Sequence, residues 1–165
     1  MTVMVTDFDT SLKLQSTVDH VIGILDKRDF DESSNRLSKV PNRTMFWFDD
    51  VHAEGTNPPT EQHIQNIIDV IKEEGLDSIH KRVLVHCRAG ISRSTATAIA
   101  LLIMRGHTIS HAIEAIHIQR PMMWPNDLMI THFDKLLDLK GELIRHHKEW
   151  KQITIFGDKL KWDKE

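Results

Sequence analysis

A cysteine and an arginine separated by five residues form the part of this 165-residue chain with the clearest chemistry. Cys87 can supply a thiolate nucleophile, and Arg93 a guanidinium fork that binds two oxygens of one anion. Gly90 lies midway between them, and Ser94 follows directly with a hydroxyl group. These residue types at this spacing suit the capture of a phosphate monoester by a nucleophile.

The residues on either side place this segment between a strand and a helix. Arg82–His86 reads as a buried strand, and the apolar run Ser94–Arg105 reads as a helix. Unpaired N–H groups and the helix dipole at such a junction favour an anion. Cysteines in such places have pKa values lowered from about 8.5 to roughly 3.5–7.5. The alternative, a buried and inert cysteine, does not explain the glycine, arginine and serines around Cys87.

A family resemblance rests on the residues from His86 to Ser94, which read His-Cys-Arg-Ala-Gly-Ile-Ser-Arg-Ser. They resemble the phosphate-binding loop of the cysteine-dependent protein tyrosine phosphatase superfamily, and the Cys-Arg-x-Gly-x-Ser-Arg-Ser form is similar to its dual-specificity branch. The resemblance runs from about Asp19 to about Leu139 and implies the protein tyrosine phosphatase-like fold.

The loop residues are assigned roles on this basis. Cys87 is expected to be the nucleophile, and Arg93 to bind the phosphate and the developing charge of the transition state. Ser94 is expected to donate to the sulfur as it leaves, and His86 to order the loop from behind. The residues expected to bind the phosphate are Arg88, Ala89, Gly90, Ile91 and Ser92, with Arg88 and Ile91 on the rim and Ser92 hydrogen-bonded within the loop.

A second similarity lies downstream, where Arg120-Pro121 and Pro125-Asn126 match the Arg-Pro and Pro-Asn pairs that follow the loop in dual-specificity enzymes. The prolines are expected to end one helix and begin the next. Asn126 is expected to cap the second helix and to brace the loop rather than to act in catalysis.

Cleavage of a phosphate ester also needs an acid to protonate the leaving oxygen. Asp49 and Asp50 follow an expected strand, which would deliver a carboxylate to the same sheet edge as Cys87. In similar family members with an aspartate pair the second one is the acid, which favours Asp50 over Asp49. His52 and Glu54 are weaker candidates.

The remaining chain alternates between expected strands and helices. Strands are expected at residues 3–5, 21–25, 44–48 and 82–86, and helices at 11–17, 60–75, 94–105, 108–120 and 126–140. Residues 27–43 read as a surface loop, 142–150 as a charged helical extension, and 153–165 as a strand followed by a frayed end. This order predicts an α/β fold with a central, mostly parallel sheet of four or five strands flanked by helices. Ligands of such sheets bind beyond the carboxyl ends of the strands.

Composition excludes several function classes. With one cysteine the chain can form no internal disulfide, dithiol relay or multi-cysteine metal site. The histidine pairs His107/His111 and His146/His147 lack well-placed acidic partners, so no metal and no cofactor are expected. A net charge of −3 gives no reason to expect nucleic-acid or membrane binding. No signal peptide or membrane-spanning run is visible, and a cytoplasmic location is expected.

The sequence thus predicts a single domain, with a core over about 1–140 and a charged extension over 141–165. The expected function is hydrolysis of phosphotyrosine in proteins through a phosphocysteine, with phosphoserine and phosphothreonine as further substrates of a shallow pocket. Two alternatives stay open: a phosphatase of RNA 5′-phosphates or inositol phosphates, and a pseudophosphatase that binds phosphorylated partners without turnover. The oligomeric state is not predicted.

Overall fold

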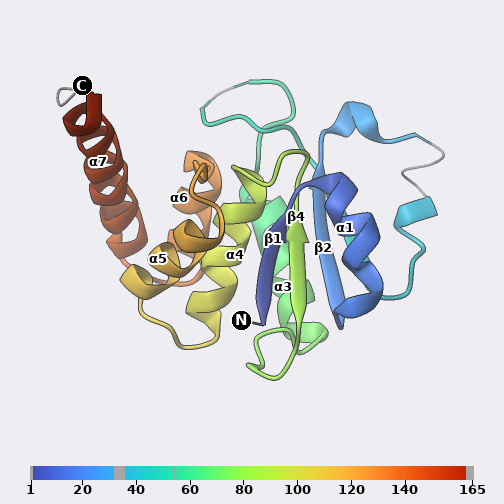
Figure 1. The fold of residues 1–165 in the computed structure, drawn as a ribbon. Coiled ribbons are helices and arrows are strands. Elements are labelled where there is room, and N and C mark those ends of the chain that lie inside the picture. Colours follow the sequence, from blue (N-terminus) through green and yellow to red (C-terminus); the bar gives the residue numbers. More distant parts are fainter. Residues whose placement is uncertain (1, 32–35, 54, 163–165) are drawn as a thin grey trace.

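The computed structural model describes residues 2–31, 36–53 and 55–162, with side chains to residue 157. Its centre is a four-stranded sheet in the order β1-β4-β2-β3, and every pairing is parallel. The strands are β1 (Val3–Thr6), β2 (His20–Leu25), β3 (Arg43–Trp47) and β4 (Val83–His86). The predicted parallel α/β sheet is therefore confirmed, at the lower of the two expected strand numbers (Figure 1).

Helices cover both faces of the sheet (Figure 1). The α-helices are α1 (Phe8–Leu14), α3 (Glu61–Glu73), α4 (Arg93–Met104), α5 (Ile109–Gln119), α6 (Asp127–Leu136) and α7 (Glu142–Trp162), with short 3-10 turns η1 (Gln15–Thr17) and η2 (Lys27–Asp29). Side chains alternate across β4: Val83 and Val85 join the large core beneath α3 and α4, whereas Leu84 joins a small cluster with Leu14 at the end of α1. The two faces thus carry cores of unequal size.

The predicted helix starts are confirmed at three caps. Thr60, Thr108 and Asn126 each accept a hydrogen bond from the backbone N–H three residues on, which satisfies a free donor of the first turn. Helix α4 is buried on every side from Arg93 to Leu102, because it lies between the sheet and the outer helices. Its first turn is therefore held at the carboxyl edge of the sheet by packing along its whole length.

Two predictions at the C-terminal end are wrong. The helix expected over 126–140 ends at Leu136, because Asp138, Lys140 and Gly141 adopt positive φ values that break the helix. The buried Asp134 carboxylate then accepts the N–H groups of Gly141, Leu143 and Ile144 and so caps a new helix.

The strand expected from Ile153 is also wrong, because α7 continues through it to Trp162. Its β-branched residues suggested a strand, but ion pairs of Arg145 with Glu142 and Glu149 at helical spacing, together with packing of Trp150 on the core, favour the helix. Among the described residues, no helix has the length and apolar content needed to cross a membrane.

The buried His147 of α7 makes the stability of this fold depend on pH. Burial, reinforced by the nearby Lys151 cation, lowers the pKa of His147 to about 4. The unfolded chain, with an ordinary histidine pKa near 6.5, therefore binds a proton that the folded chain rejects as the pH falls. The contribution of His147 to the free energy of unfolding is therefore fully present above about pH 6.5 and is lost as the pH falls towards about 4.

We predict that lowering the pH from 7 to 4.5 reduces the free energy of unfolding less in His147→Gln than in the parent protein. The difference between the two reductions should be on the order of 2 kcal/mol, measured by urea denaturation. The matched control is His146→Gln, at the neighbouring and more accessible position of the same helix, which should keep the parent's pH dependence. An equal loss in His147→Gln and the parent would contradict the prediction.

Candidate active site

The candidate site lies at the carboxyl edge of the sheet, as expected for a parallel α/β fold. The loop between β4 and α4 carries Cys87, and the segment that follows β3 passes the same edge with Asp49 and Asp50 (Figure 1). The two segments predicted to supply the nucleophile and the acid therefore meet.

Cys87 is buried beneath its own loop, with 4% of its surface exposed. Its Sγ lies 3.2 Å from Oγ of Ser94, and the backbone N–H groups of Ser94 and Ile91 also reach the sulfur. Burial alone would raise the pKa of this thiol, but the hydrogen bonds from Ser94, helped by the charge of Arg93, hold it below the ordinary value. The site is thus built to hold a thiolate, the reactive form of cysteine.

Every backbone carbonyl from Cys87 to Ser92 accepts a hydrogen bond from outside the loop. The donors come from four directions. They are Nδ1 of His86 to Cys87 (3.0 Å), the N–H of Phe8 to Arg88 (3.1 Å), Nη2 and Nε of Arg120 to Ala89 (2.9 Å) and Gly90 (3.0 Å), the N–H of Trp124 to Ile91 (2.8 Å), and the N–H of Asn126 to Ser92 (3.2 Å).

These bonds determine which way the loop amides point. In a trans peptide the N–H lies opposite the carbonyl, so carbonyls held outwards turn the following N–H groups towards the centre of the loop. The result is a concave ring of donors above the Cys87 sulfur, next to the first turn of α4. Gly90 is required in this ring, because it has a φ of 69° and a Cβ there would lie 2.6 Å from the carbonyl oxygen of Thr6.

Arg93 reaches the same ring from the first turn of α4 and is almost fully buried. Its Nη1 donates to the carbonyl of Phe48 (2.6 Å) and pairs with Oδ1 of Asp26 (2.8 Å). Its Nε has no partner among the described residues, which leaves that edge of the guanidinium for an anion. Sequence reasoning missed Asp26, although a carboxylate directly after β2, the neighbour of β4, was a usable signal.

His86 supports the loop from behind, as the sequence predicts. Its Nδ1 donates to the Cys87 carbonyl, so Nε2 is the acceptor that Nη1 of Arg43 meets at 2.6 Å. Burial lowers the pKa of His86 to about 4, which keeps the ring neutral, and the hydrogen bond to the Cys87 carbonyl fixes this tautomer. Arg43, which sequence reasoning missed, is itself buried, and Gly23 leaves the space for the pair, since a Cβ there would lie 2.4 Å from Nε2.

The two aspartates diverge. Oδ1 of Asp50 accepts hydrogen bonds from Oγ of Ser92 (2.6 Å) and Nδ2 of Asn126 (2.8 Å), so Asp50 lies against the loop that holds Cys87. Oδ1 of Asp49 instead accepts the backbone N–H of Lys27 (3.1 Å) on the η2 side. Of the pair, Asp50 is the one placed to serve the loop.

Ser92, His52 and Asn126 also lie around Asp50, and their contacts differ in part from those that the sequence predicts. The hydroxyl of Ser92 was expected to bond within the loop, but it donates to Asp50 instead. His52 lies in the site, with Nε2 at 3.3 Å from the same hydroxyl, whereas Glu54 lies outside the described residues. Asn126 braces the loop through its backbone and also binds Asp50, a second contact that the sequence did not suggest.

The rim of the site is mixed in character. Arg88 pairs with Asp29 (2.8 Å) and lies over the ring of Phe8 (5.5 Å to its centroid), with 55% of its side chain exposed. Ile91 is partly exposed on the same rim. The expectation that Arg88 and Ile91 contact the substrate beyond its phosphate stays a prediction.

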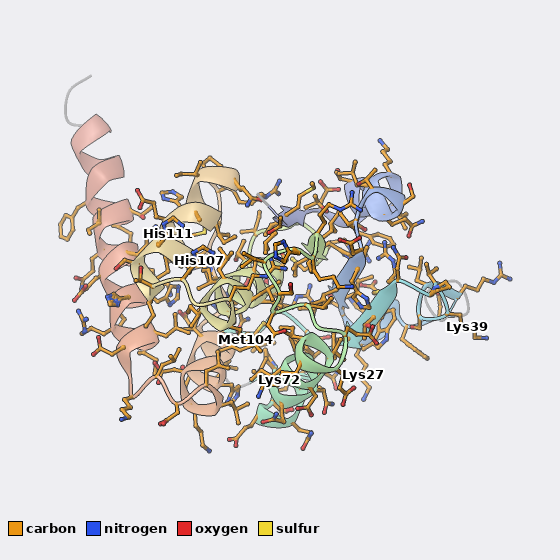
Figure 2. All side chains as sticks on the ribbon, turned by 90° about the horizontal axis from the view of Figure 1, so that it is seen from below. Lys27, Lys39, Lys72, Met104, His107 and His111 are labelled. Atoms are coloured by element: carbon orange, nitrogen blue, oxygen red, sulfur yellow. The ribbon has the colours of Figure 1, made fainter. Side chains whose placement is uncertain are left out.

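Away from this edge, His107 and His111 lie side by side where α5 begins, with ring centroids 5.0 Å apart (Figure 2). Within the part of the chain that the structure describes, no three histidine, cysteine, aspartate or glutamate side chains gather in an arrangement that could hold a metal ion. Both histidines of this pair are exposed.

The chain belongs to the dual specificity phosphatase family. The model of the dual specificity phosphatase catalytic domain matches residues 7–137, which include β2, β3, β4 and the candidate site but neither β1 nor α7. The resemblance stated from the loop sequence is therefore confirmed at the level of the family.

Individual relatives are more distant. The chain is 33% identical over 86 residues to a probable dual specificity protein phosphatase of Dictyostelium discoideum, and 32% identical over 79 residues to human Protein phosphatase Slingshot homolog 1. These matches cover 50% and 46% of this chain but only 31% and 7% of the relatives' lengths.

Among solved structures, human DUSP28 matches 86% of this chain and 95% of its own, with a TM-score of 0.60 at 17% identity. DUSP15 matches 89% of this chain and 90% of its own, with a TM-score of 0.55 at 22% identity. At these identities the likeness concerns the fold.

We predict that Ser94→Ala raises the pKa of Cys87, because the hydrogen bond of its hydroxyl is the leading stabiliser of the thiolate. Alkylation of the sole cysteine by iodoacetamide, followed by mass spectrometry across pH 5–9, should show a higher midpoint in the variant than in the parent. Ser92→Ala, which removes a hydroxyl that faces Asp50, is the control and should leave the midpoint unchanged. Equal midpoints in Ser94→Ala and the parent would contradict the role of Ser94.

We also predict that Arg93→Lys lowers kcat/KM by more than about tenfold, because a single ammonium cannot bind Asp26 and two phosphate oxygens together. The measurement is steady-state hydrolysis of an aryl phosphate, with vanadate inhibition as the readout of anion binding. Arg88→Lys on the rim serves as the matched control and should change kcat far less. Parental kinetics in Arg93→Lys would mean that its guanidinium does not reach the substrate.

Proposed function

We propose that the chain is a protein phosphatase that hydrolyses phosphotyrosine, and phosphoserine and phosphothreonine as well, through a phosphocysteine intermediate. The observation that carries this proposal is the contact of Asp50 with Ser92, which brings an acid to the loop that holds the nucleophile Cys87. Membership of the dual specificity phosphatase family supports phosphorylated proteins as the substrate class.

In the first step, the Cys87 thiolate attacks the phosphorus, a P–S bond forms and the P–O bond of the ester breaks. The electron pair goes to the leaving oxygen, which takes a proton from Asp50. Since Ser92 and Asn126 both bind Oδ1 of Asp50, Oδ2 is the oxygen that carries this proton. The inward amides and Arg93 bind the three remaining phosphate oxygens and the charge that develops on them.

In the second step, a water attacks the phosphocysteine and gives a proton to the Asp50 carboxylate. The P–S bond breaks, inorganic phosphate leaves and the electron pair returns to the sulfur. The hydroxyl of Ser94, 3.2 Å from Sγ, donates to the departing thiolate, which is the same interaction that lowers the pKa of Cys87 in the resting site.

Two other functions use the same site. A phosphatase of RNA 5′-phosphates or inositol phosphates would need the same loop, and a panel of phosphopeptides, inositol phosphates and 5′-phosphorylated RNA would separate it from a protein phosphatase. A binding module without turnover is the second alternative, and a protein named for interaction, the human tyrosine phosphatase-like serine/threonine/tyrosine-interacting protein, shares the fold over 82% of this chain with a TM-score of 0.54. The cytoplasmic location and the absence of membrane and nucleic-acid partners stay predictions.

We predict that Asp50→Asn lowers kcat on a phosphotyrosine peptide by about 100-fold or more, because an amide cannot protonate the phenolate that leaves. On 2,4-dinitrophenyl phosphate, whose leaving group needs no proton, the loss should be far smaller. Asp49→Asn, which removes the neighbouring carboxylate, should behave like the parent, and Cys87→Ser should be inactive on both substrates. A larger loss in Asp49→Asn would reverse the pair, and no loss in either would assign the acid elsewhere.

A further inference from the structure

The imidazole of His52 links the acid segment to the start of α6. Its Nε2 lies 3.3 Å from Oγ of Ser92 and 3.7 Å from Oδ1 of Asp50. Its Nδ1 lies 3.2 Å from Oδ2 of Asp127, to which it donates when it carries the ring proton, and 3.3 Å from the backbone nitrogen of the same residue. One ring therefore touches Asp50, the loop that carries Cys87, and the first turn of a helix.

The other oxygen of Asp127 is held from α7. Oδ1 pairs with Nζ of Lys151 and lies 3.6 Å from Nδ1 of His147. Burial alone would raise the pKa of Asp127, but the hydrogen bond and the charge of Lys151 hold it below the ordinary value. The carboxylate thus stays ionised and oriented, with one oxygen for His52 and the other for Lys151.

Lys151 has a second contact that leads to the same loop. Its Nζ lies 4.8 Å from the ring centroid of Trp124, a cation–π distance, and its side chain is mostly buried. The backbone N–H of Trp124 donates to the carbonyl of Ile91 in the phosphate-binding loop. The side chain of Lys151 therefore lies between two groups that both reach the candidate site.

We propose that Asp127 and Lys151 are positioning residues for proton transfer by Asp50, acting through His52. The chain of contacts runs from α7 through Lys151, Asp127 and His52 to the acid segment. The inference rests on the proposed function, because it takes Asp50 as the acid. It also assigns a role in the reaction to α7, which lies outside residues 7–137, the part of the chain that the family model matches.

The physical reason lies in the geometry that proton transfer requires. An acid acts only within hydrogen-bond reach of the leaving oxygen, so a small displacement of its carboxyl group is costly. Ser92 and Asn126 fix one oxygen of Asp50, and Asn126 also donates to the carbonyl of Val51, but this segment lies beyond the end of β3 at Trp47 and has no strand partner. His52 holds that backbone against the loop, and the ionised Asp127 holds His52.

The experiment compares two leaving groups across a set of variants. Lys151→Met and Asp127→Asn should each lower kcat on a phosphotyrosine peptide by about tenfold, and change kcat on 2,4-dinitrophenyl phosphate by less than about twofold. Lys151→Arg, which keeps the cation, should restore most of the loss. The matched control is Arg145→Met on the same helix, whose partners are Glu142 and Glu149, and it should behave like the parent.

Asp50→Asn is the reference in the same assays and separates failure of the inference from failure of the proposed function. If Asp50→Asn discriminates between the leaving groups but Lys151→Met and Asp127→Asn do not, the inference is wrong and the acid stands. If Asp50→Asn itself does not discriminate, the acid assignment is wrong. An equal loss on both substrates in Lys151→Met, with lowered thermal stability, would reduce the contact to structural support and overturn the proposal.

Discussion

The candidate site depends on one constraint, which is that the carbonyls from Cys87 to Ser92 are all held outwards. Their donors come from the start of α1, the last residue of β4, the end of α5 and the segment before α6. Amides that all face one centre are unfavourable to hold together, because their N–H dipoles repel one another, so the outward hydrogen bonds of the carbonyls are needed to keep this loop conformation. The sheet and helices bring these donors from positions far apart in the chain to a single turn, and an anion completes the arrangement.

Charge is organised around the same turn. Two guanidinium groups, those of Arg43 and Arg93, are almost fully buried near Cys87. Arg93 has a carboxylate partner in Asp26, whereas the contacts of Arg43 among the described residues are neutral groups, His86, Ser11, Gln15 and Met45. Burying such a cation is unfavourable unless the surroundings compensate for lost water. A thiolate and a bound phosphate are negative charges, so they would compensate for two buried guanidinium groups that would be unfavourable in an apolar core.

The sequence predicted those features whose signal is local. The loop was recognisable because its residues are contiguous, the caps at Thr60, Thr108 and Asn126 because each acts on the next turn, and the Asp49–Asp50 pair because it follows a strand. The sequence did not predict partners that only the fold brings together. Asp26 and Arg93, Arg43 and His86, and Asp127 and Lys151 are pairs far apart in the chain, and no local pattern links their members. The end of the chain was misread for a related reason. Positive φ values at Asp138 and Lys140 and the cap from Asp134 depend on tertiary packing, whereas β-branched residues near Ile153 have a local strand preference that packing overrides.

The carboxylate of Asp134 has a consequence for where this molecule ends as a cooperative unit. It lies buried in α6 and accepts hydrogen bonds from the backbone N–H groups at the start of α7. A chain shortened to residue 137 would keep the residues that the family model matches, yet its Asp134 carboxylate would lose the three backbone N–H donors of Gly141, Leu143 and Ile144. Residues 142–157 are thus bonded into the domain rather than appended to it, and the helix and the sheet are expected to melt in one transition.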